Sequence, residues 1–126
     1  TGADTDATGT YEVASVDVSL TKSIENIADT SGGHQPYPHA VVTYRIRVEV
    51  SGNGTAGNLV ISDPVPADMT FVPGSIVLDG IPQTDADDAP VDTSDFNITA
   101  AGAVTVNLGD SVAPATHIID FEATIN

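Results

Sequence analysis

Hydrophobic and polar residues alternate along several segments of this chain, as they do in β-strands. The clearest case is residues 42–50, where apolar side chains occupy all the even positions and Thr, Arg or Glu occupies the odd ones. A period of two places one set on each face of a strand. This segment is therefore predicted to be a strand with one buried face.

The alternation near the start of the chain changes its parity. Apolar residues occupy odd positions at Tyr11 and Val13, and even positions at Val16, Val18 and Leu20. A flat strand cannot bury both sets on one face, because successive side chains point to opposite faces. Residues 11–24 are therefore predicted to be strand, with a bulge, a kink or two different partners between Val13 and Val16.

Further short strands are predicted wherever an apolar segment is bounded by Pro or Gly. They cover residues 58–62, 70–72, 75–78, 96–99, 103–108 and 118–125. Turn-forming residues are frequent in residues 25–39 and in the acidic residues 84–95, which are predicted to be loops. Seven or eight short strands without a helical period predict an all-β, immunoglobulin-like Greek-key β-sandwich.

Size and charge limit the partners of this sandwich. The chain has 126 residues, which suits a single core, and 18 acidic against 3 basic residues give it a formal charge of −15. Binding to phosphate groups requires clustered Lys and Arg. We therefore expect no nucleic-acid partner and no membrane insertion, and a small-molecule ligand is not expected either.

The chain is predicted to consist of an arm, residues 1–15, and a sandwich, residues 16–126. The first ten residues have no large apolar side chain and contribute little to a core. The arm is interpreted as a donor strand that inserts Tyr11 and Val13 into a neighbour and extends its sheet. Two alternatives stay open: a linker within a longer polypeptide, or a tail packed on its own domain.

Four segments of the chain together resemble a known family. They are residues 18–23, 42–48, 59–71 and 121–126, and the most specific is Asp63-Pro64-Val65-Pro66 followed by Thr70-Phe71. They resemble the conserved-repeat "domain of unknown function eleven" family. The resemblance implies an immunoglobulin-like domain of bacterial or archaeal surface proteins, adhesins, stalks and fibres, located outside the cell and without catalytic activity. Holding one copy behind an arm, rather than a tandem array, favours a self-assembling subunit.

Lys22 is the only lysine, and its even position turns it toward the apolar face of its strand. Burial of a lysine is costly unless the charge is paired. One interpretation is an intramolecular isopeptide bond to an Asn or Asp side chain, with Asp63 or Glu122 moving the proton. The other is a lysine at the frayed end of the strand that extends to water.

The acidic loop offers the oxygen ligands that calcium requires. The candidate ligands are Asp85, Asp87, Asp88 and Asp92. The spacing lacks the glycine and the closing glutamate of an EF-hand, so a solvated acidic loop is the competing interpretation.

Two sites satisfy the acceptor rule for N-glycosylation, Asn53 and Asn97, although a Thr-rich chain also produces such sites by chance. The sequence contains no cysteine and no nucleophile or phosphate-binding motif, so no enzyme activity and no cofactor are expected. We therefore predict a filament subunit that associates with itself into a homopolymer. The alternatives are an adhesin or stalk repeat, or a calcium-stabilised binding module.

Overall fold

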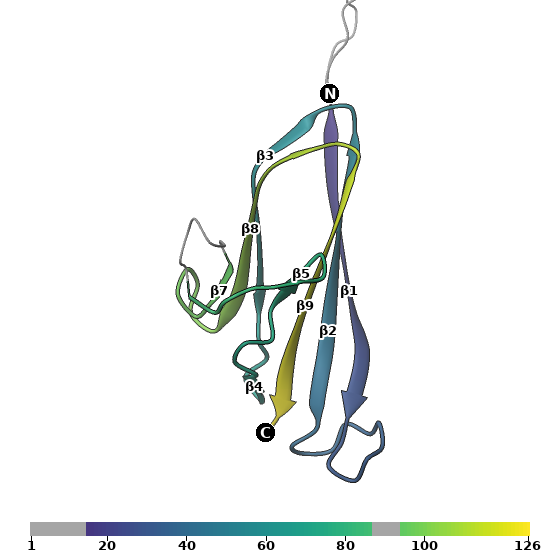
Figure 1. Cartoon of the computed structure of the whole chain (residues 1–126), viewed down its shortest axis with the longest axis vertical. Coiled ribbons are helices and arrows are strands. Elements are labelled where there is room, and N and C mark those ends of the chain that lie inside the picture. Colours follow the sequence, from purple (N-terminus) through teal and green to yellow (C-terminus); the bar gives the residue numbers. More distant parts are fainter. Residues whose placement is uncertain (1–14, 87–93) are drawn as a thin grey trace, which may run out of the picture.

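The computed structural model describes residues 15–86 and 94–126, which form two packed antiparallel β-sheets without a helix (Figure 1). The larger sheet has the strand order β1-β2-β9-β5-β6, and β4 pairs with β9 beside this path. Its strands are β1 (Val16–Ala28), β2 (Val41–Gly52), β4 (Met69–Phe71), β5 (Val77–Leu78), β6 (Ile81–Pro82) and β9 (Ala115–Ile125). The smaller sheet has the order β3-β8-β7. Its strands are β3 (Thr55–Pro64), β8 (Ala103–Val112) and β7 (Ser94–Phe96).

One hydrophobic core lies between the sheets. Ile119 and Phe121 of β9 are fully buried and meet side chains from both sheets. The rings of Phe71 and Phe96 stack 4.2 Å apart between centroids, with Phe71 in this core and Phe96 packed against it. The remaining members of the buried cluster are Ile46, Val48, Ile61, Ile76, Val104 and Val106. The predicted all-β sandwich is thus confirmed, while its immunoglobulin-like Greek-key connectivity stays a prediction.

Several predicted boundaries were wrong. The strand β1 continues through Glu25 to Ala28, which was expected to be loop, because a bulge between Ile24 and Asn26 lets it stay paired with β2. The strand β7 ends at Phe96, where a strand was expected to begin. Asp95 is buried and not part of a surface loop, since its carboxylate accepts hydrogen bonds from the backbone N–H groups of the turn that follows. The short strand β6 was not predicted.

The chain enters β1 at one end of the sandwich and reaches its last residue at the other end (Figure 1). The entry point is fixed by the β2–β3 turn. Ser15 N–H donates to Asn53 Oδ1 at 2.8 Å, and Asn53 N–H donates to the Ser15 carbonyl at 2.9 Å. Gly52 has a φ of +107°, and a Cβ there would lie 2.4 Å from the Ser15 oxygen, so this contact requires glycine.

Candidate assembly site

The strand β1 forms one edge of the larger sheet, and its inward-facing apolar side chains are exposed. Val18, Leu20 and Ile24 are 41%, 56% and 55% exposed. They lie directly opposite Val50, Val48 and Tyr44 of β2. Opposed residues of a ladder share one face of the sheet, so this row of β1 faces the same side as the core. We call Val18, Leu20 and Ile24 the β1 row.

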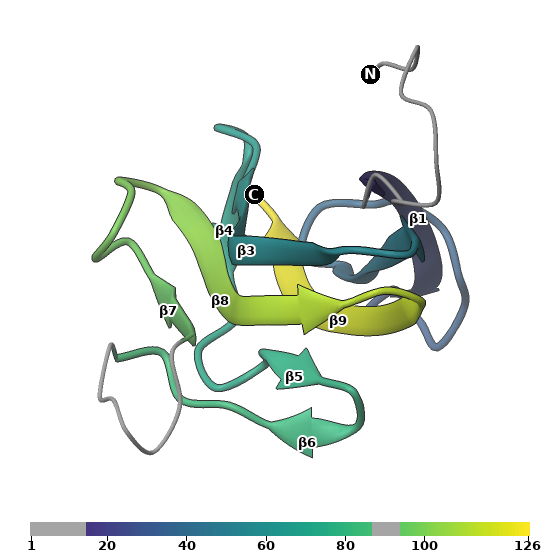
Figure 2. The same ribbon diagram turned by 90° about the horizontal axis from the view of Figure 1, so that it is seen from above.

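The β1 row is far more exposed than the residues that lie opposite it on the neighbouring strand β2. Val48 is fully buried and Val50 is 2% exposed, although each lies one strand away from a row member that is about half exposed. Over residues 15–86 and 94–126 the smaller sheet has three strands, and its edge strand β3 contacts β1. Seen from above, β1 lies at the side of the molecule farthest from β7 (Figure 2). The described sandwich therefore ends before it covers β1.

Lys22 interrupts the β1 row with a charge, as its sequence position predicted. Its ammonium lies 2.8 Å from Asp63 Oδ2 of β3 and 4.5 Å from the centre of the Tyr44 ring. The ring face attracts the cation and the carboxylate neutralises it. This ion pair joins the free edges of the two sheets, because β1 and β3 are each unpaired on one side within the described residues.

The geometry around Lys22 bears on the isopeptide hypothesis. Asp63 is the residue that contacts the ammonium, so it is the bonding partner that the geometry offers. Glu122, considered as a proton carrier, was the wrong choice. It pairs with Thr43 on the outer face of the sheet, whereas Lys22 and Tyr44 lie on the inner face. The cross-link itself stays a prediction.

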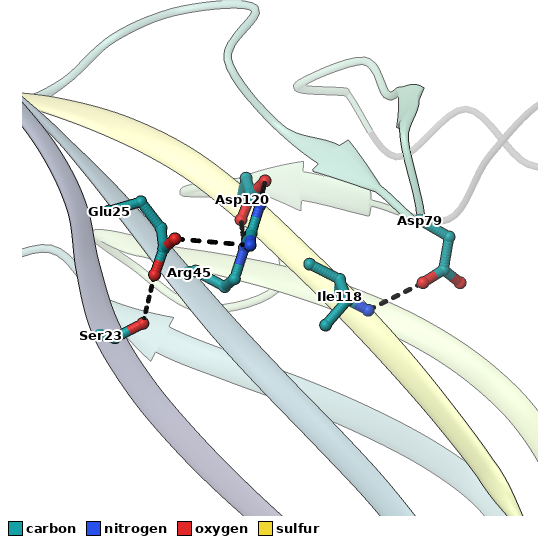
Figure 3. Close-up of polar contacts among 6 residues, drawn as sticks. All are labelled: Ser23, Glu25, Arg45, Asp79, Ile118 and Asp120. Atoms are coloured by element: carbon teal, nitrogen blue, oxygen red, sulfur yellow. Dashed lines mark hydrogen bonds and ion pairs between the residues drawn. The ribbon is translucent and has the colours of Figure 1, made fainter.

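The outer face of the same strands is polar and internally paired (Figure 3). The guanidinium of Arg45 on β2 donates two hydrogen bonds to Asp120 of β9, at 2.9 and 3.0 Å, and lies 3.4 Å from Glu25 of β1. The hydrogen bond and the charge of Asp120 raise the pKa of Arg45. Ser23 donates to Glu25 at 2.8 Å. Three strands are thus linked across the outer face, and the apolar surface lies on the inner one.

The arm residues Tyr11 and Val13, and the parity change after them, lie outside the described residues. The structure places Ser15 at the tip of the sandwich, and the arm connects there. The candidate calcium ligands Asp87, Asp88 and Asp92 also lie outside the described part of the chain. The candidate calcium site therefore stays a prediction.

Asp85 is the one calcium candidate that the structure describes. Its Oδ2 accepts a hydrogen bond from Gly74 N–H at 2.8 Å, and its backbone carbonyl accepts one from Phe96 N–H at 3.0 Å. Its Oδ1 is buried without a hydrogen-bond partner among the described residues. Over residues 15–86 and 94–126, no three His, Cys, Asp or Glu side chains form a group that could hold a metal ion.

The two glycosylation candidates are exposed and lie in turns. Asn53 holds Ser15 as described above, and Asn97 accepts a hydrogen bond from Gly102 N–H at 2.7 Å through Oδ1. In both cases the bonded atom is the amide oxygen, and the nitrogen that would carry a glycan makes no bond in these contacts. Glycosylation stays a prediction at both positions.

Sequence reasoning missed Asp29, which organises the β1–β2 loop. Its carboxylate accepts hydrogen bonds from the backbone N–H groups of Ser31, Gly33 and Gln35, at 2.8 to 2.9 Å, and from the Ser31 hydroxyl at 2.6 Å. These donors lower the pKa of Asp29 far below its usual range. An Asp followed by Ser and then Gly at two-residue intervals was the available signal.

Comparisons with known proteins give no relative for this chain. No protein-family model matches it, and neither a curated protein nor a solved structure does. No helix among the described residues has the length and apolarity needed to cross a membrane. The resemblance to the conserved-repeat family therefore stays a prediction, and the open edge of β1 is the feature from which function is argued.

Proposed function

We propose that this chain is a structural subunit of an extracellular filament or cell-surface fibre, in which residues 1–15 add a β-strand to a neighbouring copy. The observation that carries the proposal is the β1 row, three apolar side chains about half exposed on the inner face of a strand that has no partner on its outer edge among the described residues. Soluble proteins normally shorten or charge their edge strands. The strand β1 has 13 residues, and apolar and polar residues alternate strictly from Val16 to Leu20. No described strand covers its apolar row.

The positions of the two ends support head-to-tail growth. The arm leaves the sandwich at Ser15, at the end opposite the last residue of the chain (Figure 1). A strand donated beyond that end joins one surface of a copy to a different surface of the next. Such a contact does not close on itself and extends into a fibre. No catalytic role is proposed, and the extracellular location rests on the family resemblance alone.

The charge of the chain shapes the conditions of assembly. A formal charge of −15 makes copies repel one another in dilute buffer. Salt screens this repulsion over about 10 Å at 0.1 M ionic strength. Backbone hydrogen bonds and apolar contacts of an added strand are screened far less. Assembly is therefore expected to strengthen as salt is added.

The test is electron microscopy and sedimentation velocity of the purified chain in 0.15 M salt, beside a Tyr11→Asp, Val13→Asp variant. The unmodified chain should form filaments, and the variant should sediment as a folded monomer. A chain that stays monomeric at high concentration and at all salt concentrations would overturn the proposal. It would support a spacer repeat of a larger surface protein.

A second candidate function is a calcium-stabilised binding module. The observation that favours it is the buried Oδ1 of Asp85, which has no hydrogen-bond partner among the described residues and which precedes Asp87, Asp88 and Asp92 in the sequence. Calcium binds such carboxylate oxygens, and extracellular modules do so at millimolar concentrations. A calcium-dependent rise in melting temperature that Asp85→Asn abolishes would support this function. An unchanged melting temperature in calcium and in chelator would exclude it.

A further inference from the structure

We propose that the acceptor for the arm is the seam between β1 and β3, where a strand from a second copy pairs with the free edge of β3 and covers the β1 row. The seam is lined by Val18, Leu20 and Ile24 on one side and by the backbone edge of residues 60–64 on the other. The Lys22–Asp63 ion pair crosses it. This inference rests on the proposed filament function and locates its docking surface.

The two free edges are not equivalent acceptors. A strand added to β1 would lengthen the larger sheet and leave the β1 row as exposed as before. A strand added to β3 extends the smaller sheet, so that it lies across from β1 at the spacing of about 10 Å between packed sheets. Only the second arrangement buries the β1 row. The pairing of β3 with β8 is regular over residues 60–64, and the upstream bulges end at Val60.

The arm has the alternation that this position demands. Its odd positions carry only apolar or small residues, namely Ala3, Thr5, Ala7, Gly9, Tyr11 and Val13. Its even positions from Asp4 to Glu12 carry only acidic residues and threonine, namely Asp4, Asp6, Thr8, Thr10 and Glu12. One face of an extended arm would therefore pack on the β1 row while the acidic face meets water. Small side chains suit a seam that Val, Leu and Ile side chains already line.

The arm is also long enough for the task. Fourteen extended residues span about 46 Å, whereas the β1 row from Val18 to Ile24 spans about 20 Å. The surplus bridges the distance between two copies. A donated arm can thus cover the whole row of its neighbour while it stays joined to its own sandwich at Ser15.

The same arithmetic argues against the arm of the same copy as the occupant. To enter its own seam, the arm would have to reverse direction, and residues 10–14 contain no Gly, Pro, Asn, Asp or Ser to form a turn, while the backbone of Ser15 is held by Asn53. A reversal at Gly9 would send six residues outward over about 20 Å and eight residues back over about 26 Å. The arm would then pass the tip of the sandwich by only about 6 Å. The β1 row would stay uncovered.

Cross-linking tests the seam directly, and the absence of natural cysteine makes introduced pairs specific. The full chain carries Ala7→Cys together with Leu20→Cys, and the matched control carries Ala7→Cys with Ile81→Cys. Ile81 is 63% exposed and lies on β6, at the opposite edge of the sheet. Both are treated with a bismaleimide that spans about 10 Å, the spacing of packed sheets, and are analysed on a denaturing gel and by electron microscopy.

We expect a ladder of covalent oligomers from the Leu20 pair, at least tenfold stronger than from the Ile81 pair. Filaments without a Leu20 ladder would overturn the seam and leave the filament function standing. A ladder on the gel together with only short oligomers in the electron microscope would support the seam and contradict the filament function. An internal cross-link, seen as a monomer carrying the reagent mass, would show that the arm folds on its own copy and would overturn the inference. Neither filaments nor a ladder would overturn both proposals.

Discussion

Leu20 and Val48 lie directly opposite each other in the β1–β2 ladder, yet Leu20 is 56% exposed and Val48 is fully buried. Both belong to alternating segments with one apolar face, so the sequence pattern predicts burial for both side chains. The difference arises because β3 and β8 cover β2, whereas no described strand covers the β1 row. Burying an exposed Leu contributes about 1.5–3 kcal/mol, so completing the cover of a half-exposed one contributes about 1 kcal/mol.

This contrast predicts unequal costs of truncation in the monomer. Val48→Ala removes buried methyl groups and leaves a cavity, so it should lower the free energy of unfolding by about 2 kcal/mol. Leu20→Ala removes a side chain that is half in water and should cost less than about 1 kcal/mol. Urea denaturation under monomeric conditions measures both. Equal losses would show that the β1 row is already covered within a single copy.

Assembly should depend on the Leu20 side chain, although this side chain contributes little to the stability of the monomer. Leu20→Asp places a carboxylate where the added strand packs, and burial of an unpaired charge is strongly disfavoured. We expect this variant to keep its fold and lose its filaments. Ile81→Asp, the matched control on the other edge of the sheet, should assemble normally. Sedimentation velocity separates the two, and loss of assembly in both variants would point to charge and not to the seam.

The pKa of Asp29 predicts how the β1–β2 loop responds to acid. The pKa is lowered in the folded state, chiefly by the Ser31 hydroxyl and the backbone N–H groups. The carboxylate therefore stabilises the fold fully above its unfolded pKa of about 3.9, and this contribution is lost as pH falls toward the folded-state value. Asp29→Asn should lower the melting temperature at pH 7. The difference in melting temperature from the unmodified chain should be smaller at pH 2. A difference in melting temperature that does not change with pH would contradict this role of the Asp29 charge.

The Lys22–Asp63 contact predicts a definite mass. An ion pair leaves the intact mass at the sequence value, whereas an isopeptide bond between these side chains would remove one water. We expect the full mass, because no other carboxylate among the described contacts of Lys22 is placed to move the proton. Mass spectrometry of the denatured chain decides this. A mass lower than the sequence value by one water would establish the cross-link instead, provided that the Lys22→Arg variant shows the full mass of its own sequence.

The sheets were predictable from the sequence because alternation fixes which side chain faces the core. The β2 and β9 segments keep a period of two over most of their length, and both form the strands expected of them. The boundaries at Ala28 and Phe96 were missed for a local reason. A bulge at Glu25 and the buried Asp95 cap are made by polar residues, which the hydrophobic pattern does not describe.

The candidate site was predictable only in part. The sequence indicated that Lys22 faces the apolar side and that the arm breaks parity before Val16. It could not indicate that the β1 row lies uncovered, because exposure depends on how many strands the opposite sheet holds. The sequence offered Asp63 and Glu122 as carboxylates near Lys22 but could not decide between them, since β1 and β3 lie about 40 residues apart in the sequence.

The central claim is that residues 1–14 join one copy to the next. Electron microscopy of the purified chain, with and without these residues, tests it most directly, with circular dichroism to confirm that both proteins are folded. The account predicts filaments from the full chain and isolated monomers from the shortened one. Filaments that persist after the deletion would contradict it.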